Sequence, residues 1–378
     1  MPTKPSFLSF WSRKKDARSK KRKKGPIREW TEALLFAVIA ASIIRGFILE
    51  AFTIPTSSME KSLLVGDFLF VSKYHYGART PITPISFPLV HNEMPIFGGD
   101  SYLESVQLPY YRLPGLSEIE RRDVVVFNYP QDADHPVDKR DNYIKRCVAL
   151  PGDTFEIRNR RVFIDGKPEK WPATFQFAYL VKTNGNGFSE RALRRLDITD
   201  YFYNPQSGIF EMYMTEKAAQ AIGRMRHVEE VLPKIQPDST FNPYVYPYYK
   251  PLPWNVDNYG PLVIPRAGMS VAMTPVNYHL YGRCIRDYER PDSQLKIQDG
   301  QVYLDGQALD RYTFEMDYYF MMGDNRHNSK DSRYWGFVPQ NHILGKAILT
   351  WFSLDSKAPS LGERVRWERI GSMIEHGD

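Results

Sequence analysis

The sequence has very little cysteine: Cys147 and Cys284 are the only two among 378 residues. Neither stands in the short, paired spacing typical of zinc ligands, so we expect no metal site and no cofactor. In an oxidising compartment the two thiols could form a disulfide, and two separate buried thiols are the equal alternative. The sequence leaves this choice open.

Long apolar runs are also scarce, because residues 30–49 form the only one. At about 1.5 Å per residue, this stretch is long enough to cross a bilayer core of about 30 Å. Its uncharged centre, residues 33–44, also has the length of a cleavable signal-peptide core. The long segment before it and Arg45 directly after it favour an uncleaved span, in which Arg45 reaches back to the interface. We therefore predict one transmembrane helix over residues 29–49 and no polytopic membrane protein.

Positive charge is concentrated at one end of the chain. Residues 1–24 hold ten Lys or Arg and one Asp, so their net charge is +9. The net charge of the whole chain is +6, so the rest of the chain has a net charge of −3. A body without excess positive charge excludes nucleic acid as its partner. By the positive-inside rule, residues 1–28 are predicted to be a basic cytoplasmic tail. Everything after Glu50 then lies outside the cytoplasmic membrane.

The body is rich in aromatic residues and proline, with 24 Tyr, 22 Phe and 28 Pro. This composition favours short strands and many turns, so we predict a mainly β fold. Two similar segments, 155–167 and 295–307, each read as a hairpin followed by an Asp-Gly turn. The spacing of apolar residues predicts a helix over 215–232, and residues 244–264 read as an ordered loop. Other predicted segments are an extended loop region at 74–120 and strands at 68–71, 122–130, 141–150, 318–322 and 343–352.

Ser58 stands in a turn beside the predicted span, and a tight turn at Gly66-Asp67 follows it. A serine hydroxyl is a poor nucleophile unless a base removes its proton. None of the eight histidines lies in a setting typical of a Ser-His-Asp triad. Lys145 lies in a mostly apolar strand, where burial would lower its pKa and make it a base. A lysine that points to solvent is the alternative that the residues alone favour.

Four blocks occur in order: Ile-Pro-Thr-Ser-Ser-Met (54–59), Arg-Asp-Val-Val-Val-Phe (122–127), Tyr-Ile-Lys-Arg-Cys-Val-Ala-Leu-Pro-Gly-Asp (143–153) and Gly-Asp-Asn-Arg-His-Asn-Ser-Lys-Asp-Ser-Arg-Tyr-Trp-Gly (323–336). Placed after a membrane anchor, this set closely resembles bacterial type I signal peptidase. The matching blocks cover roughly residues 45–73, 121–157 and 318–352. The resemblance implies a membrane-anchored serine endopeptidase that removes signal peptides from exported preproteins with a Ser/Lys dyad.

The resemblance also implies roles for individual residues. Ser58 matches the nucleophile and Lys145 the general base, while Thr56 matches a hydroxyl that joins the Ser58 backbone N–H in the oxyanion hole. Ser329 matches a serine that orients the lysine amine. The charged residues expected to form structural ion pairs are Arg146, Asp324, Asp331 and Arg333. The apolar residues expected to line shallow pockets for an Ala-x-Ala substrate are Phe52, Ile54, Met59, Leu63, Leu69, Val126 and Ile144.

The implied architecture is an antiparallel β-sheet catalytic body at residues 50–153 and 315–378, with a β-rich insertion lobe at 154–314. His327 stands where the family often has Asp, and we take that departure as peripheral. The expected partners are signal-peptide-bearing preproteins, the lipid bilayer and a neighbouring secretion translocon. On a regular strand Cys147 shares a face with Lys145 and points inward, which disfavours a disulfide with Cys284.

Two other functions compete with this one. A non-catalytic binding subunit of an export assembly, built on the same scaffold, would have lost Ser58 or Lys145, and the sequence keeps both. A self-cleaving repressor of the same Ser/Lys class would need a cytoplasmic DNA-binding segment in place of the anchor. The substrate preproteins, the ligands of residues 154–314 and the oligomeric state are not encoded in any motif.

Overall fold

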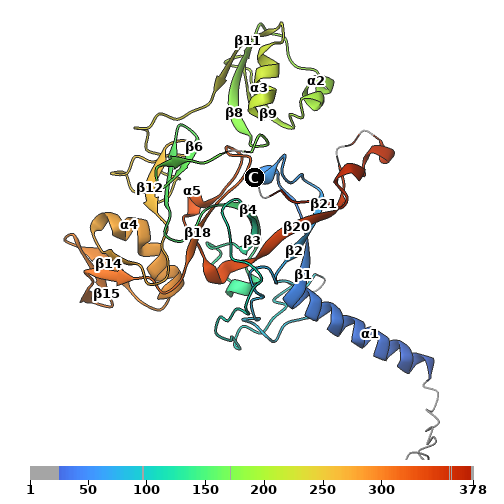
Figure 1. The fold of residues 1–378 in the computed structure, drawn as a ribbon, viewed down its shortest axis with the longest axis vertical. Helices are drawn as coiled ribbons and strands as arrows, with labels where there is room; N and C mark the ends of the chain where they lie inside the picture. The colour runs from blue at the N-terminus through green and yellow to red at the C-terminus, as the bar shows by residue number, and fades with distance from the viewer. Residues whose placement is uncertain (1–24, 96–97, 171, 357, 359, 376–378) are drawn as a thin grey trace, which may run out of the picture. The chain divides into compact units, whose positions relative to one another are not determined.

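The computed structural model describes residues 25–95, 98–170, 172–356, 358 and 360–375 (Figure 1). Most of the predicted basic tail, residues 1–24, lies outside the described residues. The chain divides into two units, residues 1–42 and 43–378, which are taken separately below.

Helix α1 (Pro26–Ile43) continues as a short π-helix (Ile44–Ile48). Together they make 23 residues, and among the described residues this is the one helix long and apolar enough to cross a membrane. The helix starts before the predicted residue 29 because proline suits the first helical turn, where its missing N–H leaves no bond unmade. It ends at Ile48 because the chain becomes extended at Leu49 and enters the main sheet.

The main sheet has eight strands in the order β1-β2-β20-β3-β4-β18-β19, with β21 paired to β20, and its pairings are antiparallel (Figure 1). The mainly β, antiparallel fold is therefore confirmed. The predicted strands are present with ends shifted by a few residues. Their bounds are β1 (Leu49–Thr53), β2 (Asp67–Ser72), β3 (Val124–Asn128), β4 (Asn142–Ala149), β18 (Tyr318–Met322), β19 (Val338–Pro339), β20 (Ile343–Ser353) and β21 (Ser372–Met373).

The two similar segments form similar structures. The first is β5 (Thr154–Arg158), β6 (Arg161–Ile164) and β7 (Lys167–Pro168), and the second is β14 (Leu295–Gln298), β15 (Gln301–Leu304) and β16 (Gln307–Ala308). In each, an Asp-Gly pair with positive φ makes the last turn, which aspartate and glycine tolerate best. Both predicted hairpins are confirmed.

Residues 244–264 are not loop throughout, because β12 (Tyr259–Val263) pairs with β5. The smaller elements of this region are β13 (Ser270–Ala272), which pairs with β17 (Arg311–Thr313), and helix α4 (Pro275–Arg283), which continues as a π-helix (Cys284–Glu289). A large core joins these elements to strand β18, and it includes Phe155, Tyr259, Cys284 and Phe320. Part of the 154–314 segment therefore packs directly on a strand of the main sheet.

Apart from the main sheet, a four-stranded sheet with the order β11-β8-β10-β9 has a hydrophobic core of its own. We call residues 175–233 the β8–β11 lobe. Its elements are β8 (Phe177–Thr183), α2 (Glu190–Arg195), β9 (Asp200–Asn204), β10 (Ile209–Met214), α3 (Glu216–Gly223) and β11 (Val228–Pro233) (Figure 1).

The predicted helix over 215–232 is wrong in its second half, because α3 ends at Gly223 and β11 follows. A short apolar run is compatible with the periodicity of a helix or of a strand. Here the residues form a strand, because Val231 pairs with Val181 on β8. Residues 74–120 hold only isolated bridges in their described part, such as Arg79 to Arg112, as the loop prediction requires.

Both cysteines are free and buried, Cys147 beside β3 and β18 and Cys284 in the large core. The structure therefore has two separate buried thiols, and Cys147 and Cys284 do not form a disulfide.

Candidate active site

Ser58 lies in a short 3-10 turn (Ser57–Met59) between the antiparallel strands β1 and β2. Met59 and Leu63 after it are fully buried, so the turn is anchored to the core while Ser58 itself keeps 9% of its surface exposed. Gly66 returns the chain into β2 with φ +90°, and a Cβ there would lie 2.0 Å from the Leu354 carbonyl oxygen. Glycine is the residue this turn requires.

Lys145 is in the middle of β4, between β3 and β18, and only 3% of its surface is exposed. Its Nζ lies 2.7 Å from Ser58 Oγ and donates to the Ile144 carbonyl oxygen at 2.9 Å. The alternative of a solvent-facing lysine is therefore wrong. Two residues far apart in the sequence meet as a hydrogen-bonded Ser/Lys pair.

Burial lowers the pKa of Lys145 to about 8, because an ammonium loses hydration in this site. The carboxylates of Asp331 and Asp324 act in the opposite direction and raise it. A pKa near 8 leaves a useful fraction of the amine neutral at physiological pH, and only the neutral amine can accept a proton.

The turn at residues 323–331 forms hydrogen bonds and close contacts with the backbone around Ser58. Asn325 donates its backbone N–H to the Ser58 carbonyl oxygen at 3.1 Å and its side-chain amide to the Ser57 carbonyl oxygen at 3.2 Å. Gly323 lies so close that a Cβ there would be 2.5 Å from the Ser58 carbonyl oxygen and 2.2 Å from Ser329 Oγ. Sequence reasoning assigned no role to Gly323 or Asn325, although both stand in the Gly-Asp-Asn motif that it singled out.

The charged residues form two fully buried ion pairs. Arg146 holds Asp324 with bonds of 2.8 and 2.6 Å, and Arg333 holds Asp331 with bonds of 2.9 and 2.8 Å. Burial acts to raise the pKa of Asp331, but the Arg333 guanidinium outweighs it and lowers the value below its usual range. Because Asp331 also accepts the Gly323 N–H at 3.1 Å, the second pair fixes the turn beside Ser58.

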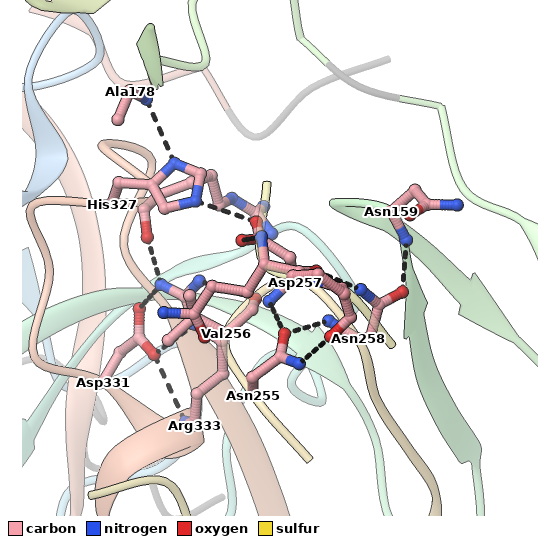
Figure 2. A network of polar contacts seen from close by, with 12 residues as sticks. Asn159, Ala178, Asn255, Val256, Asp257, Asn258, His327, Asp331 and Arg333 are labelled. Carbon is pink, nitrogen blue, oxygen red and sulfur yellow. Dashed lines mark hydrogen bonds and ion pairs between the residues drawn. The ribbon is translucent and has the colours of Figure 1, made fainter. Parts of the chain in front are cut away.

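His327 is not peripheral, contrary to our expectation (Figure 2). Its Nε2 lies 2.8 Å from Asp257 Oδ1, and its Nδ1 accepts the backbone N–H of Ala178 at 3.1 Å. Asn255 in turn accepts the N–H of Asp257 at 3.0 Å, and Arg333 donates to the Val256 carbonyl oxygen. The network joins the 323–331 turn, the 255–258 loop and strand β8, so His327 ties the β8–β11 lobe to the turn beside Ser58.

The apolar residues expected to line substrate pockets gather in one cluster around Ser58. Phe52 and Ile144 are partly exposed. The others are buried in the same cluster; they are Ile54, Met59, Leu63, Leu69 and Val126.

The two hydroxyl residues predicted to assist Ser58, Thr56 and Ser329, differ in their contacts with the Ser58–Lys145 pair. Thr56 is exposed, and its Oγ1 is 3.5 Å from Ser58 Oγ. Ser329 is buried against Gly323, and among the described residues it makes no hydrogen bond to Lys145. In the described part of the chain, Ser58 Oγ accepts a hydrogen bond from Lys145 and shares one with Thr56 Oγ1, in which either hydroxyl can donate; no histidine contacts it.

The described residues contain no group of three His, Cys, Asp or Glu side chains placed to hold a metal ion. The hydrogen bond between Lys145 and Ser58 places an amine beside a hydroxyl group, which could serve as base and nucleophile.

The sequence is similar to known proteins over most of its length. The family model described as signal peptidase, peptidase S26, matches residues 27–212 and 294–352. The chain is 27% identical to the signal peptidase I of Haemophilus influenzae, over 94% of this chain and 79% of that protein. It is 26% identical to those of Buchnera aphidicola (88% and 77%) and Aquifex aeolicus (89% and 87%). The family match extends beyond the motif blocks into the expected insertion lobe at 154–314, and it omits residues 213–293 there.

Proposed function

The chain belongs to the signal peptidase family, peptidase S26, and on that premise we propose that Ser58 is its nucleophile and Lys145 its general base. The protein is a hydrolase that removes signal peptides from preproteins. The relatives named above are all signal peptidases, so they give no support to a non-catalytic binding subunit. The observation that carries the catalytic assignment is the buried 2.7 Å hydrogen bond between Lys145 and Ser58.

In the first step the neutral Lys145 amine takes the Ser58 hydroxyl proton while Oγ attacks the scissile carbonyl carbon. The new C–O bond makes a tetrahedral oxyanion, which the Ser58 N–H and the Thr56 hydroxyl stabilise. The Lys145 ammonium then gives its proton to the leaving amine, so the C–N bond breaks and an ester to Ser58 remains. Water, deprotonated by the same amine, hydrolyses this ester and frees Ser58.

The neighbours of the pair have supporting roles. Asn325 and Gly323 hold the Ser58 backbone, and the Lys145 amine is oriented by its hydrogen bond to the Ile144 carbonyl oxygen, with Ser329 packed against Gly323 beside the site. The ion pairs Arg146–Asp324 and Arg333–Asp331 brace the turn. Phe52 and Ile144, over the buried apolar floor, receive the small side chains of an Ala-x-Ala end.

The protein is a single-pass membrane protein, because its described residues contain one helix long and apolar enough to cross a membrane and its relatives are signal peptidases. We propose that its N-terminus lies in the cytoplasm and its catalytic body on the outer side of the cytoplasmic membrane, because residues 1–24 are strongly basic. A short segment separates Ile48 from Ser58, which keeps the nucleophile near the bilayer and near preproteins that leave the translocon.

The test is cleavage of a preprotein with an Ala-x-Ala site by the detergent-purified full chain. We expect cutting after the second Ala by the wild type, and loss of cutting in Ser58→Ala and Lys145→Ala. Cys284→Ala, which changes a buried residue of the large core, serves as the control that retains activity. Cutting that survives Lys145→Ala would remove the lysine from its role, and a folded but inactive wild type would refute the peptidase function.

A further inference from the structure

A cavity of about 480 Å³ opens beside the nucleophile turn, and nothing in the mechanism above uses it. One wall is Ser57, Glu60 and Val65, from the segment around Ser58. The facing wall comes from the β8–β11 lobe, at α2 and the residues up to β9. A third side comes from Asp355, Ser356 and Arg366. The cavity shares no residue with the apolar cluster at the substrate pockets, so it is a separate site.

The lobe wall is held against the nucleophile turn by specific contacts. Asn328 donates its side-chain amide to Ser57 Oγ and to Asp200 Oδ2, both at 3.1 Å. Lys61 lies 2.8 Å from Asp197. Residue Gln176 bridges to Asn325 through the backbone. Specific contacts therefore fix the walls of the cavity, and its shape depends on the position of the β8–β11 lobe.

Carboxylates outnumber cationic side chains in the cavity lining, five to two. Most have a cationic partner: Asp197 pairs with Lys61, Glu190 with Arg194, and Asp355 with Arg366. Asp200 has no ion pair among the described residues, and its polar contact is the amide of Asn328. The lining keeps an excess of negative charge at Asp200 and Glu60.

Glu60 is the least satisfied of these groups. Only 5% of its surface is exposed, its carboxylate forms no hydrogen bond within the described residues, and its nearest cation is Lys61 Nζ at 3.8 Å. A buried carboxylate without good partners is costly, so a cation from outside would stabilise it. Burial, with Asp200 and Asp197 adding to it against Lys61 and Arg366, raises the pKa of Glu60 to about 7.

We propose that this cavity binds the first residues of the mature protein, on the leaving side of the scissile bond, and that Glu60 and Asp200 select a positively charged side chain there. A peptide whose small side chains sit over Phe52 and Ile144 has its scissile carbonyl at Ser58. Its next residues continue past Ser58, and the cavity begins at the adjacent Ser57. This inference rests on the proposed peptidase function and gives the β8–β11 lobe a role in substrate choice.

The experiment uses the full chain in detergent and three preproteins that share one signal peptide and Ala-x-Ala site. They differ only in the second mature residue, which is Lys, Gln or Glu. We expect the wild type to cut the Lys form with kcat/KM roughly fivefold higher than the Glu form, as for a partly desolvated charge pair. Asp200→Asn and Glu60→Gln should each bring this ratio toward one, because both keep the side-chain shape and remove the charge.

Glu230→Gln is the matched control, because Glu230 is an exposed carboxylate of the same lobe that does not line the cavity. It should leave the Lys-to-Glu ratio unchanged. If the wild type cuts the Lys and Glu substrates with similar kcat/KM, or prefers the Glu substrate, that result alone overturns the inference. A ratio that falls equally in Glu230→Gln also overturns it, since a general charge effect would then be responsible. A wild type that cuts none of the three substrates would instead reject the peptidase function on which the inference depends.

Discussion

Gly323→Ala is the sharpest test of how the catalytic pair is held. The added Cβ would lie 2.5 Å from the Ser58 carbonyl oxygen, whereas ordinary contacts begin at 3.4 Å. Ser58 or the 323–331 turn must therefore move by about 0.9 Å, and a misplacement of about 1 Å at a reacting group costs roughly 100-fold in rate. We expect kcat to fall about 100-fold, together with an overpacking cost of about 1–3 kcal/mol in the free energy of unfolding.

The assay is a single-turnover cleavage rate at saturating preprotein, with urea unfolding measured in parallel. Gly115→Ala is the matched control, because its Cβ would also lie 2.5 Å from a carbonyl oxygen, that of His75, in the 74–120 loops. It should lose similar stability and keep the cleavage rate. The reasoning is refuted if Gly323→Ala slows cleavage no more than Gly115→Ala does.

Three further predictions concern charge. Because Lys145 accepts a proton only when neutral and burial lowers its pKa to about 8, kcat should rise with pH to a plateau with a midpoint near 8; a flat profile from pH 6 to 10 would exclude this base. Asp324→Ala leaves the Arg146 guanidinium buried without its partner, so urea titration should show a loss of about 3–5 kcal/mol, against less than about 1 kcal/mol for Glu229→Ala in an exposed pair. The Lys-to-Gln substrate ratio should grow between pH 6 and 8 as Glu60 ionises, and since both substrates share the same base, an unchanged ratio would count against Glu60.

Local patterns were enough to predict much of this protein. The apolar helix, the strands around Val126 and Lys145, and both Asp-Gly hairpins follow from hydrophobic periodicity and turn chemistry, which neighbouring residues determine. The resemblance of the motif blocks added the pairing of Ser58 with Lys145. The residues alone favoured a lysine in solvent, because a lone strand lysine carries no sign of what covers it.

What the sequence determined by itself is therefore the apolar helix, the strands of the motif blocks and both hairpins, because short runs of residues predict them. The resemblance supplied Ser58 and Lys145 as the proposed reacting groups. Tertiary structure decided the rest. Burial of Lys145 by β3 and β18, the close approach of Gly323 to Ser58, the tie from His327 to the lobe and the end of α3 all depend on contacts between distant segments. Such contacts have no local signature, because a side chain's pKa and packing are set by which distant residues exclude water from it.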